Sequence, residues 1–306
     1  MKKILFHLGL LLLPVLLNAQ SSFRETIMKA DSLYKAENFK ASAETYEQAF
    51  TIKEGNASAH YNTACSWALA GQAEKAMTYL EQSVDKGWTN LKWMQKDSDL
   101  NSLHQLEAWK NLVKKLEGII AELEKNMNKP LKKELEEIYV EDQKYRRMID
   151  SIEQNFGRKS KEMTDHWKLI QQVDSVNEMR VIEIIDEFGW PGTSLVGRQA
   201  NSAVWLVIQH APLETQEKYL PLLQESVKKG ESRGSNLALL EDRILMRNGK
   251  PQKYGSQVTT DKATGKRHFH EIMDPANVNK RREEVGLGPI EEYARRFGFE
   301  YEVPEQ

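Results

Sequence analysis

Hydrophobic positions recur every three to four residues along most of the chain, which is the spacing of one face of an α-helix. Residues 107–188 are a long run of helix formers with few glycines. Short extended runs bounded by turn residues occur only at 252–258 and 267–272. The pattern therefore predicts a mainly α-helical protein with one small β-hairpin near 252–272.

The N-terminal third repeats itself with a shift of 34 residues. The shift aligns Ala30 with Ala64 and Ala49 with Ser83, so that small residues recur where two antiparallel helices come closest. The two segments resemble tetratricopeptide repeats: ADSLYKAENFKASAETYEQAF and YNTACSWALAGQAEKAMTYLEQSV. We expect two helical hairpins, and the resemblance implies that they bind a protein or peptide partner.

A cap must follow the second repeat, because about three repeats are needed to bury the faces of a helical solenoid. Residues 86–116 supply tryptophan and leucine anchors for an irregular helical cap, and large apolar side chains of this kind are mostly buried. The anchors are Trp88, Leu91, Trp93, Leu100, Leu103, Leu106, Trp109 and Leu112. We place the repeats and their cap at residues 20–126.

Residues 1–19 are typical of a secretory signal peptide: Lys2 and Lys3 precede an apolar run at 4–17, and small and polar residues follow. We expect cleavage after Ala19, which exposes Gln20 and places the mature protein in the periplasm or outside the cell. The alternative is an uncleaved membrane anchor, but the apolar run is shorter than the roughly 20 residues that cross a bilayer. No cysteine lies near the cut, which excludes a lipoprotein.

Charge and cysteine content narrow the classes of partner. The chain has 43 basic and 45 acidic residues, so it lacks the positive field that binds nucleic acid or anionic lipid. Loss of the two leader lysines leaves 41 basic residues against 45 acidic ones and a net charge of −4. The single cysteine, Cys65, lies in an apolar helical stretch, and we interpret it as a buried packing residue.

A second domain, expected at residues 127–306, begins near Pro130 and changes character after Phe188. A helix rich in small and apolar residues ends at Gln209-His210-Ala211-Pro212, so His210 lies at a helix C-terminus. Asp242 and Arg243 interrupt a later apolar helix. They either face solvent, as most charged residues do, or enter a cleft and orient a substrate.

The hairpin supplies the only weak metal candidates. His268 and His270 share one face of a strand, a geometry that can ligate zinc with Glu271, Asp274 or His210 as a further ligand. Two exposed histidines beside basic residues are the simpler interpretation, because a metal site needs three or four positioned ligands. We expect no cofactor, and no nucleophile elbow, phosphate-binding loop or zinc-protease motif is present.

Five phrases between Pro130 and Phe299 resemble the uncharacterised bacterial domain-of-unknown-function family 6624. The phrases are GWPGTSLVG, QHAP, LALLEDR, GKPQKYGSQV and DPANVNKRREEVGLGPIEEYA. The resemblance implies no reaction, but it raises the chance that polar residues within the phrases line a shared pocket. Beside His210, Asp242 and Arg243, the ligand-binding candidates are Gln252, Tyr254, Gln257, Asp274 and Arg282.

Two functions remain open from sequence. In the first, the chain is an exported interaction and ligand-binding protein of the cell envelope, with the repeats binding a protein or peptide. In the second, it is an envelope hydrolase in which His210 acts as acid or base, Asp242 orients it and Arg243 stabilises negative charge. Both depend on the polar residues of the second domain meeting at one place.

Overall fold

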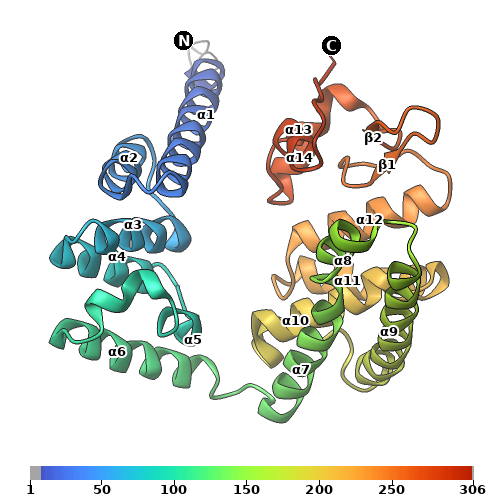
Figure 1. Ribbon diagram of the computed structural model, residues 1–306, viewed down its shortest axis with the longest axis horizontal. Helices are drawn as coiled ribbons and strands as arrows, with labels where there is room; N and C mark the ends of the chain where they lie inside the picture. The colour runs from blue at the N-terminus through green and yellow to red at the C-terminus, as the bar shows by residue number, and fades with distance from the viewer. Residues whose placement is uncertain (1–7, 305–306) are drawn as a thin grey trace, which may run out of the picture. The chain divides into compact units, whose positions relative to one another are not determined.

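The computed structural model describes residues 8–304, with side chains described from residue 22 onward. Within that range the chain forms 14 α-helices, two 3-10 helices and one two-stranded sheet (Figure 1). The expected mainly helical fold with one small hairpin is therefore confirmed. The chain divides into two compact units, unit 1 at residues 1–125 and unit 2 at residues 126–306.

The expected leader overlaps the first helix, α1 (Leu8–Lys35). Residues 1–7 lie outside the described residues, and residues 8–19 are described only as backbone of α1. Within residues 8–304 no helix is both long enough and apolar enough to cross a bilayer.

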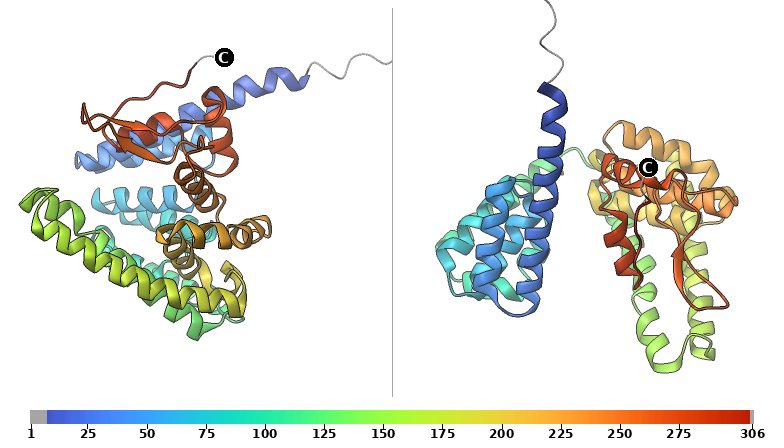
Figure 2. Two further views of the ribbon diagram at one scale, coloured as in Figure 1. Left: turned by 90° about the vertical axis from the view of Figure 1, so that its right-hand side faces the viewer. Right: turned by 90° about the horizontal axis from the view of Figure 1, so that it is seen from above.

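Unit 1 begins with two antiparallel helical hairpins that pack in sequence (Figure 1, Figure 2). They consist of α1 with α2 (Phe39–Ile52) and α3 (Ala57–Leu69) with α4 (Ala73–Asp85). Ala30, Ala43, Ala64 and Ala76 are fully buried between the helices. Such small side chains allow two helix backbones to approach closely, as the 34-residue shift predicts.

The two hairpin turns have the same backbone conformation although their sequences differ. Glu37 has φ +58° and Gly71 has φ +74°, so a glutamate adopts the left-handed conformation that usually favours glycine. In each turn the next residue donates from its backbone N–H to a carbonyl five residues earlier: Asn38 to Leu33 and Gln72 to Trp67, both at 2.9 Å. This equivalence at a shift of 34 residues supports the repeat.

The expected cap consists of α5 (Leu91–Met94), a 3-10 helix η1 (Ser98–Leu103) and α6 (Glu107–Leu123). Leu100, Leu103, Trp109 and Leu112 are buried against α3 and α4, as expected. Trp93 is the exception, because 54% of its surface is exposed. Its burial was predicted from residue type alone, and the short helix α5 turns this side chain outward.

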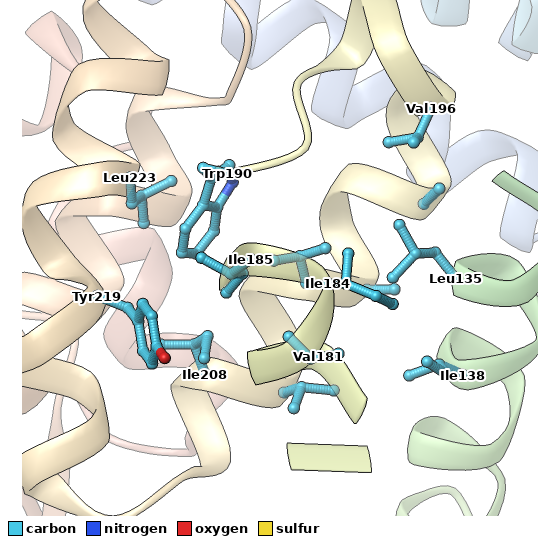
Figure 3. Close-up of a cluster of buried hydrophobic side chains, with 14 of the residues drawn as sticks. Leu135, Ile138, Val181, Ile184, Ile185, Trp190, Val196, Ile208, Tyr219 and Leu223 are labelled. Atoms are coloured by element: carbon cyan, nitrogen blue, oxygen red, sulfur yellow. The ribbon is translucent and has the colours of Figure 1, made fainter. Parts of the chain in front are cut away.

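Unit 2 is built around five helices: α7 (Lys129–Arg146), α9 (Lys161–Phe188), α10 (Thr193–His210), α11 (Leu213–Lys228) and α12 (Gly234–Arg247). The short α8 (Ile149–Phe156) joins α7 to α9. Apolar side chains from all five helices gather in one core, part of which is shown in Figure 3. Leu135, Ile184 and Ile208 are fully or almost fully buried there. The core fixes α7 and α10 side by side, which positions the site described below.

The turn before α10 is formed by a glycine and a glutamate from a later loop. Gly189 ends α9 with φ +68°, and Glu231 then accepts a hydrogen bond from Ser194 N at 2.8 Å at the start of α10. A carboxylate at a helix N-terminus satisfies free N–H groups and the helix dipole. Within α10, Gly197 has φ +79° and makes a kink after the first turn.

The C-terminal part carries the hairpin, formed by β1 (Val258–Thr260) and β2 (Arg267–Phe269), with Val258 opposite Phe269. The 3-10 helix η2 (Pro275–Asn277) and the helices α13 (Val278–Glu284) and α14 (Ile290–Arg296) follow. Both strands are shorter than predicted, since residues 252–257 form a loop with only an isolated bridge from Gln252 to Ile272. The extended pattern was misleading here because a buried carboxylate, described below, binds the N–H groups that a strand would pair.

Candidate functional site

His210 and Asp142 form a side-chain pair between the C-termini of α10 and α7. His210 Nδ1 lies 3.1 Å from Asp142 Oδ1, and the Asp142 side chain is only 1% exposed whereas that of His210 is 19% exposed. A carboxylate can only accept hydrogen bonds, so Nδ1 carries the hydrogen. This leaves Nε2, for which no partner occurs within residues 22–304, as the second nitrogen of the ring.

Asp142 is stabilised as a carboxylate despite its burial. Burial alone raises its pKa, but the hydrogen bond and charge of His210 and the charge of Arg146 outweigh that effect and hold the pKa below its ordinary value. Gln143 Nε2 donates to Asp142 Oδ2 at 2.7 Å. Asp142 therefore remains ionised at neutral pH and fixes the orientation of the imidazole.

Asp174 on α9 extends this cluster through Arg146, whose Nη2 lies 2.8 and 2.7 Å from the two Asp174 oxygens. Ligand atoms of Asp142, Asp174 and His210 lie within 4.8 Å of one another, which is the spacing of a metal site. The Arg146 guanidinium already contacts both carboxylates, and a cation would have to displace it. The cluster is therefore better suited to proton transfer than to metal binding.

Two arginines on α12 flank His210. Arg243 Nη1 donates to Gln209 O and Arg247 Nη1 donates to Ala211 O, both at 2.8 Å. These carbonyls end α10, where the helix dipole is negative. Arg243 is also 3.4 Å from Gln257 Oε1. Burial lowers the pKa of Arg243, and the nearby positive charges of Arg247 and Arg146 lower it further.

Asp242, the expected partner of His210, instead binds the loop at 252–257. Its fully buried carboxylate accepts hydrogen bonds from Lys253 N at 2.7 Å, Tyr254 N at 3.0 Å and Ser256 N at 2.9 Å. Burial raises the pKa of Asp242, and the three N–H groups partly offset the rise. The carboxylate beside His210 is thus Asp142, whereas Asp242 holds the backbone of the loop at 252–257.

Gln252 and Gln257 hold the same loop against the hairpin. The fully buried Gln252 donates from Nε2 to Gln257 O and His270 O at 3.0 and 2.9 Å, and its Oε1 accepts from Gln257 N at 2.8 Å. Gln257 then links the loop to Arg243. Of these two ligand-binding candidates, only Gln257 contacts the arginines beside His210.

The remaining ligand-binding candidates, Tyr254, Asp274 and Arg282, make no hydrogen bond to His210, Arg243 or Arg247 among the described residues. Arg282 is 2% exposed and donates from Nη1 to Tyr254 O and from Nε to Gly288 O, both at 2.6 Å. The guanidinium also lies 5.0 Å from the Tyr293 ring centroid. Asp274 is exposed and accepts hydrogen bonds from Asn277 within its own turn. We therefore assign Arg282 and Asp274 to loop structure.

The two weak metal candidates lie on or next to β2 beside a cavity of about 400 Å³. The cavity is lined by His268, His270 and Glu271 together with residues from the C-terminal tail, and His210 and Arg243 do not line it. In the part of the chain that the structure describes, neither His268 nor His270 belongs to a group of three possible metal ligands.

Sequence reasoning missed Asp142, although a pattern in α7 marks it. Leu131, Leu135, Ile138 and Asp142 are the buried residues of that helix and follow each other at spacings of four, three and four. An aspartate that continues an apolar face must be buried, and a buried carboxylate needs a partner. The run of helix formers at 107–188 gave no other signal that would single out this aspartate.

Unit 1 contains a second, partly buried cluster of potential ligands, Cys65, Asp97 and Asp99. Asp97 accepts hydrogen bonds from Tyr61 at 2.8 Å and, more weakly, from Cys65 Sγ at 3.8 Å, and Asp99 accepts one from Tyr34. Burial raises the pKa of the Cys65 thiol, so Cys65 is a neutral packing residue, as expected. These contacts tie the cap to the repeat helices.

Comparison with known proteins identifies a family for unit 2. A protein-family model described as "Family of unknown function (DUF6624)" matches residues 130–303, which is more than half of the chain. No curated protein and no solved structure matches. The resemblance found in the C-terminal phrases is confirmed, whereas the tetratricopeptide resemblance stays a prediction with which the helical hairpins are compatible.

Proposed function

Because the chain belongs to the family of unknown function DUF6624, we propose a function from the chemistry of its own residues: unit 2 is a hydrolase-like domain that uses His210 as general acid and base. The observation that carries this proposal is the contact of His210 Nδ1 with the buried Asp142 carboxylate, at 3.1 Å. Asp142 replaces Asp242 in the role that the sequence assigned to the latter.

The carboxylate gives the imidazole the properties of a base. It fixes the hydrogen on Nδ1, leaves the lone pair of the neutral ring on Nε2, and stabilises the imidazolium that forms when Nε2 takes a proton. No serine or cysteine side chain among the described residues is hydrogen bonded to His210. Water is therefore the nucleophile that we propose.

The reaction needs one proton carrier and one positive group. Nε2 accepts a proton from water while the water oxygen attacks a carbonyl carbon or a phosphorus atom, and the imidazolium returns the proton to the leaving group. Arg243, which donates to the carbonyl preceding His210, stabilises the negative charge that develops on the attacked group.

The test is hydrolysis of a panel of chromogenic carboxylic esters, phosphomonoesters and phosphodiesters by the purified chain. We expect at least one class to be hydrolysed and the rate to fall by about 100-fold or more in His210→Gln. His268→Gln removes an exposed imidazole of the same unit and serves as the matched control. Hydrolysis that His210→Gln leaves unchanged would exclude the proposal.

A second proposal concerns the setting of this domain: the chain is exported after cleavage near Ala19, and unit 1 binds a protein or peptide in the periplasm or medium. Its support is the leader pattern, the paired hairpins and the exposed Trp93 on α5. Mass spectrometry of the protein from its native host should find Gln20 as the first residue. An intact Met1 in the envelope fraction would contradict cleavage.

Binding by unit 1 is tested separately with chemical crosslinking in the native envelope. Trp93→Ala should reduce a specific crosslinked partner, whereas Trp167→Ala, which removes a tryptophan of similar exposure from unit 2, should not. Equal crosslinking in both variants would mean that Trp93 is not part of a binding surface.

A further inference from the structure

The arginines beside His210 have no acidic partner among the described residues, a feature that they share with Arg282 and Arg267, but they alone lie next to His210. Arg146 pairs with Asp174, Arg180 with Glu134, and Arg281 with Asp274. Arg243 contacts only the carbonyl of Gln209 and the amide of Gln257, and Arg247 contacts only the carbonyl of Ala211, within the described residues. Two positive charges are thus placed together without a carboxylate.

This arrangement has an electrostatic cost that a bound anion would remove. Arg243 is partly buried, and burying a cation without a counter-charge is unfavourable. Its pKa is lowered by that burial and by the like charges of Arg247 and Arg146. The negative end of the α10 dipole compensates for part of the charge, but a dipole end carries only about half an elementary charge.

The geometry of the two arginines suits one shared ligand. They are four residues apart on α12, so their side chains leave the same face of the helix. Each uses Nη1 to contact a carbonyl next to His210, at 2.8 Å. In both, Nη2 has no hydrogen-bond partner among residues 22–304 and is available to an oxyanion.

We propose that Arg243 and Arg247 form an oxyanion-binding site, and that the substrate of the proposed reaction carries a carboxylate or phosphate group that these arginines hold beside His210. The statement about the substrate rests on the proposed function, whereas the binding site does not. The opposing explanation is that both arginines only cap the C-terminus of α10.

The experiment measures binding of inorganic phosphate and, separately, of acetate to the full chain by isothermal titration calorimetry at low ionic strength. We expect one anion to bind, and Arg243→Met to weaken it by about tenfold or more, since a charge-assisted hydrogen bond is worth about 1.5–3 kcal/mol. Arg247→Met should also weaken binding. The anion that binds more tightly identifies the ligand class.

The matched control is Arg198→Met, which removes one positive charge from an exposed position of unit 2. Gln216 Nε2 also donates to Gln209 O, so Arg243→Met does not leave that carbonyl without a donor. If Arg243→Met nevertheless fails to fold, anion binding by Arg247→Met, a change at an exposed position, tests the inference in its place. Absence of binding in the unmodified chain, or equal weakening by Arg198→Met, overturns the inference in favour of simple helix capping.

Failure of this inference and failure of the proposed function give different results. Phosphate or acetate binding that Arg243→Met abolishes, with no hydrolysis of any ester, supports the anion site and contradicts the acid–base proposal. Hydrolysis that depends on His210 but is equally fast for uncharged esters, with no anion binding, supports the acid–base proposal and contradicts the anion site. If the chain binds an anion without hydrolysing any ester, His210→Gln should bind that anion as the unmodified chain does.

Discussion

Units 1 and 2 each contain carboxylates that are hydrogen bonded to polar side chains, partly buried in unit 1 and fully buried at Asp142 in unit 2. The two units differ in which hydrogen-bonding groups remain without a partner among the described residues. In unit 1, Asp97 and Asp99 receive hydroxyl groups from Tyr61 and Tyr34, and Cys65 contributes a weak donor. Every donor in this set belongs to the protein and is used within it. The cluster therefore serves structure, since each of its hydroxyl and thiol donors already has a partner within it.

In unit 2 the buried carboxylate Asp142 is equally well satisfied, but its partners are not. His210 keeps Nε2, and Arg243 and Arg247 keep donors, without a partner among residues 22–304. A hydrogen-bonded acid by itself therefore does not indicate a functional site. Unused hydrogen-bonding capacity next to that acid is the better indicator.

The largest expected effect is on catalysis. His210→Gln should lower hydrolysis by about 10²–10⁴-fold, because a general base is removed. Tyr61→Phe, which removes the corresponding donor from the unit 1 cluster, should leave the rate unchanged. The proposed difference between the units is wrong if Tyr61→Phe lowers the rate as much as His210→Gln.

The largest effect on stability is expected from Asp242→Ala. Three backbone N–H groups lose their acceptor, and each buried unsatisfied donor costs about 1–3 kcal/mol. The free energy of unfolding of unit 2 in urea should fall by at least about 3 kcal/mol. Asp274→Ala, at an exposed turn, should change it by less than about 1 kcal/mol. Similar values for both would show that the loop does not depend on Asp242.

A smaller loss is expected in unit 1 from Asp97→Ala. This change removes the N-cap of η1, where Asp97 Oδ1 accepts from Asp99 N at 3.2 Å, and the acceptor of the Tyr61 hydroxyl. The free energy of unfolding of unit 1 should fall by about 1–2 kcal/mol. Calorimetric binding of phosphate or acetate should stay the same. A change in binding would mean that the Asp97 cluster of unit 1 also contributes to the anion site of unit 2.

The smallest expected effect is a pH dependence of stability due to Asp142. Its pKa is lower in the folded chain than in the unfolded chain, so the unfolded state takes up protons first as the pH falls. The stability contributed by Asp142 is present above the ordinary carboxyl pKa and is lost below it, as the pH falls through the folded value. His210, Arg146, Gln143 and Asp174 surround the group.

Urea unfolding at a series of pH values checks this dependence. The unmodified chain should lose more stability than Asp142→Asn on acidification from neutral pH. Parallel curves for the two proteins would contradict the lowered pKa.

Periodicity predicted most of the fold, because helical burial follows a pattern that is local in sequence. The hairpin was predicted too long, since the loop at 252–257 is shaped by Asp242, a residue on another element. Burial of Trp93 was also predicted wrongly, because residue type does not reveal which way a four-residue helix faces.

The site was predicted in part. His210 and Arg243 were identified because each lies in an otherwise apolar helix, and both contribute to the cluster at the end of α10. The pairing was not predicted, because sequence alone does not say which carboxylate, Asp142 or Asp242, lies opposite His210. That choice depends on the packing of α7 against α10, whose residues are 68 positions apart at the Asp142–His210 contact.

The most direct measurement is the tautomer of His210, read from the ¹⁵N shifts of its ring nitrogens in a long-range ¹H–¹⁵N spectrum of the neutral side chain. We predict hydrogen on Nδ1 and a lone pair on Nε2, and a loss of this preference in Asp142→Asn. Hydrogen on Nε2 in the unmodified chain would contradict the proposed mechanism, because Nδ1 would then carry no hydrogen for the Asp142 carboxylate and Nε2 could not act as the base.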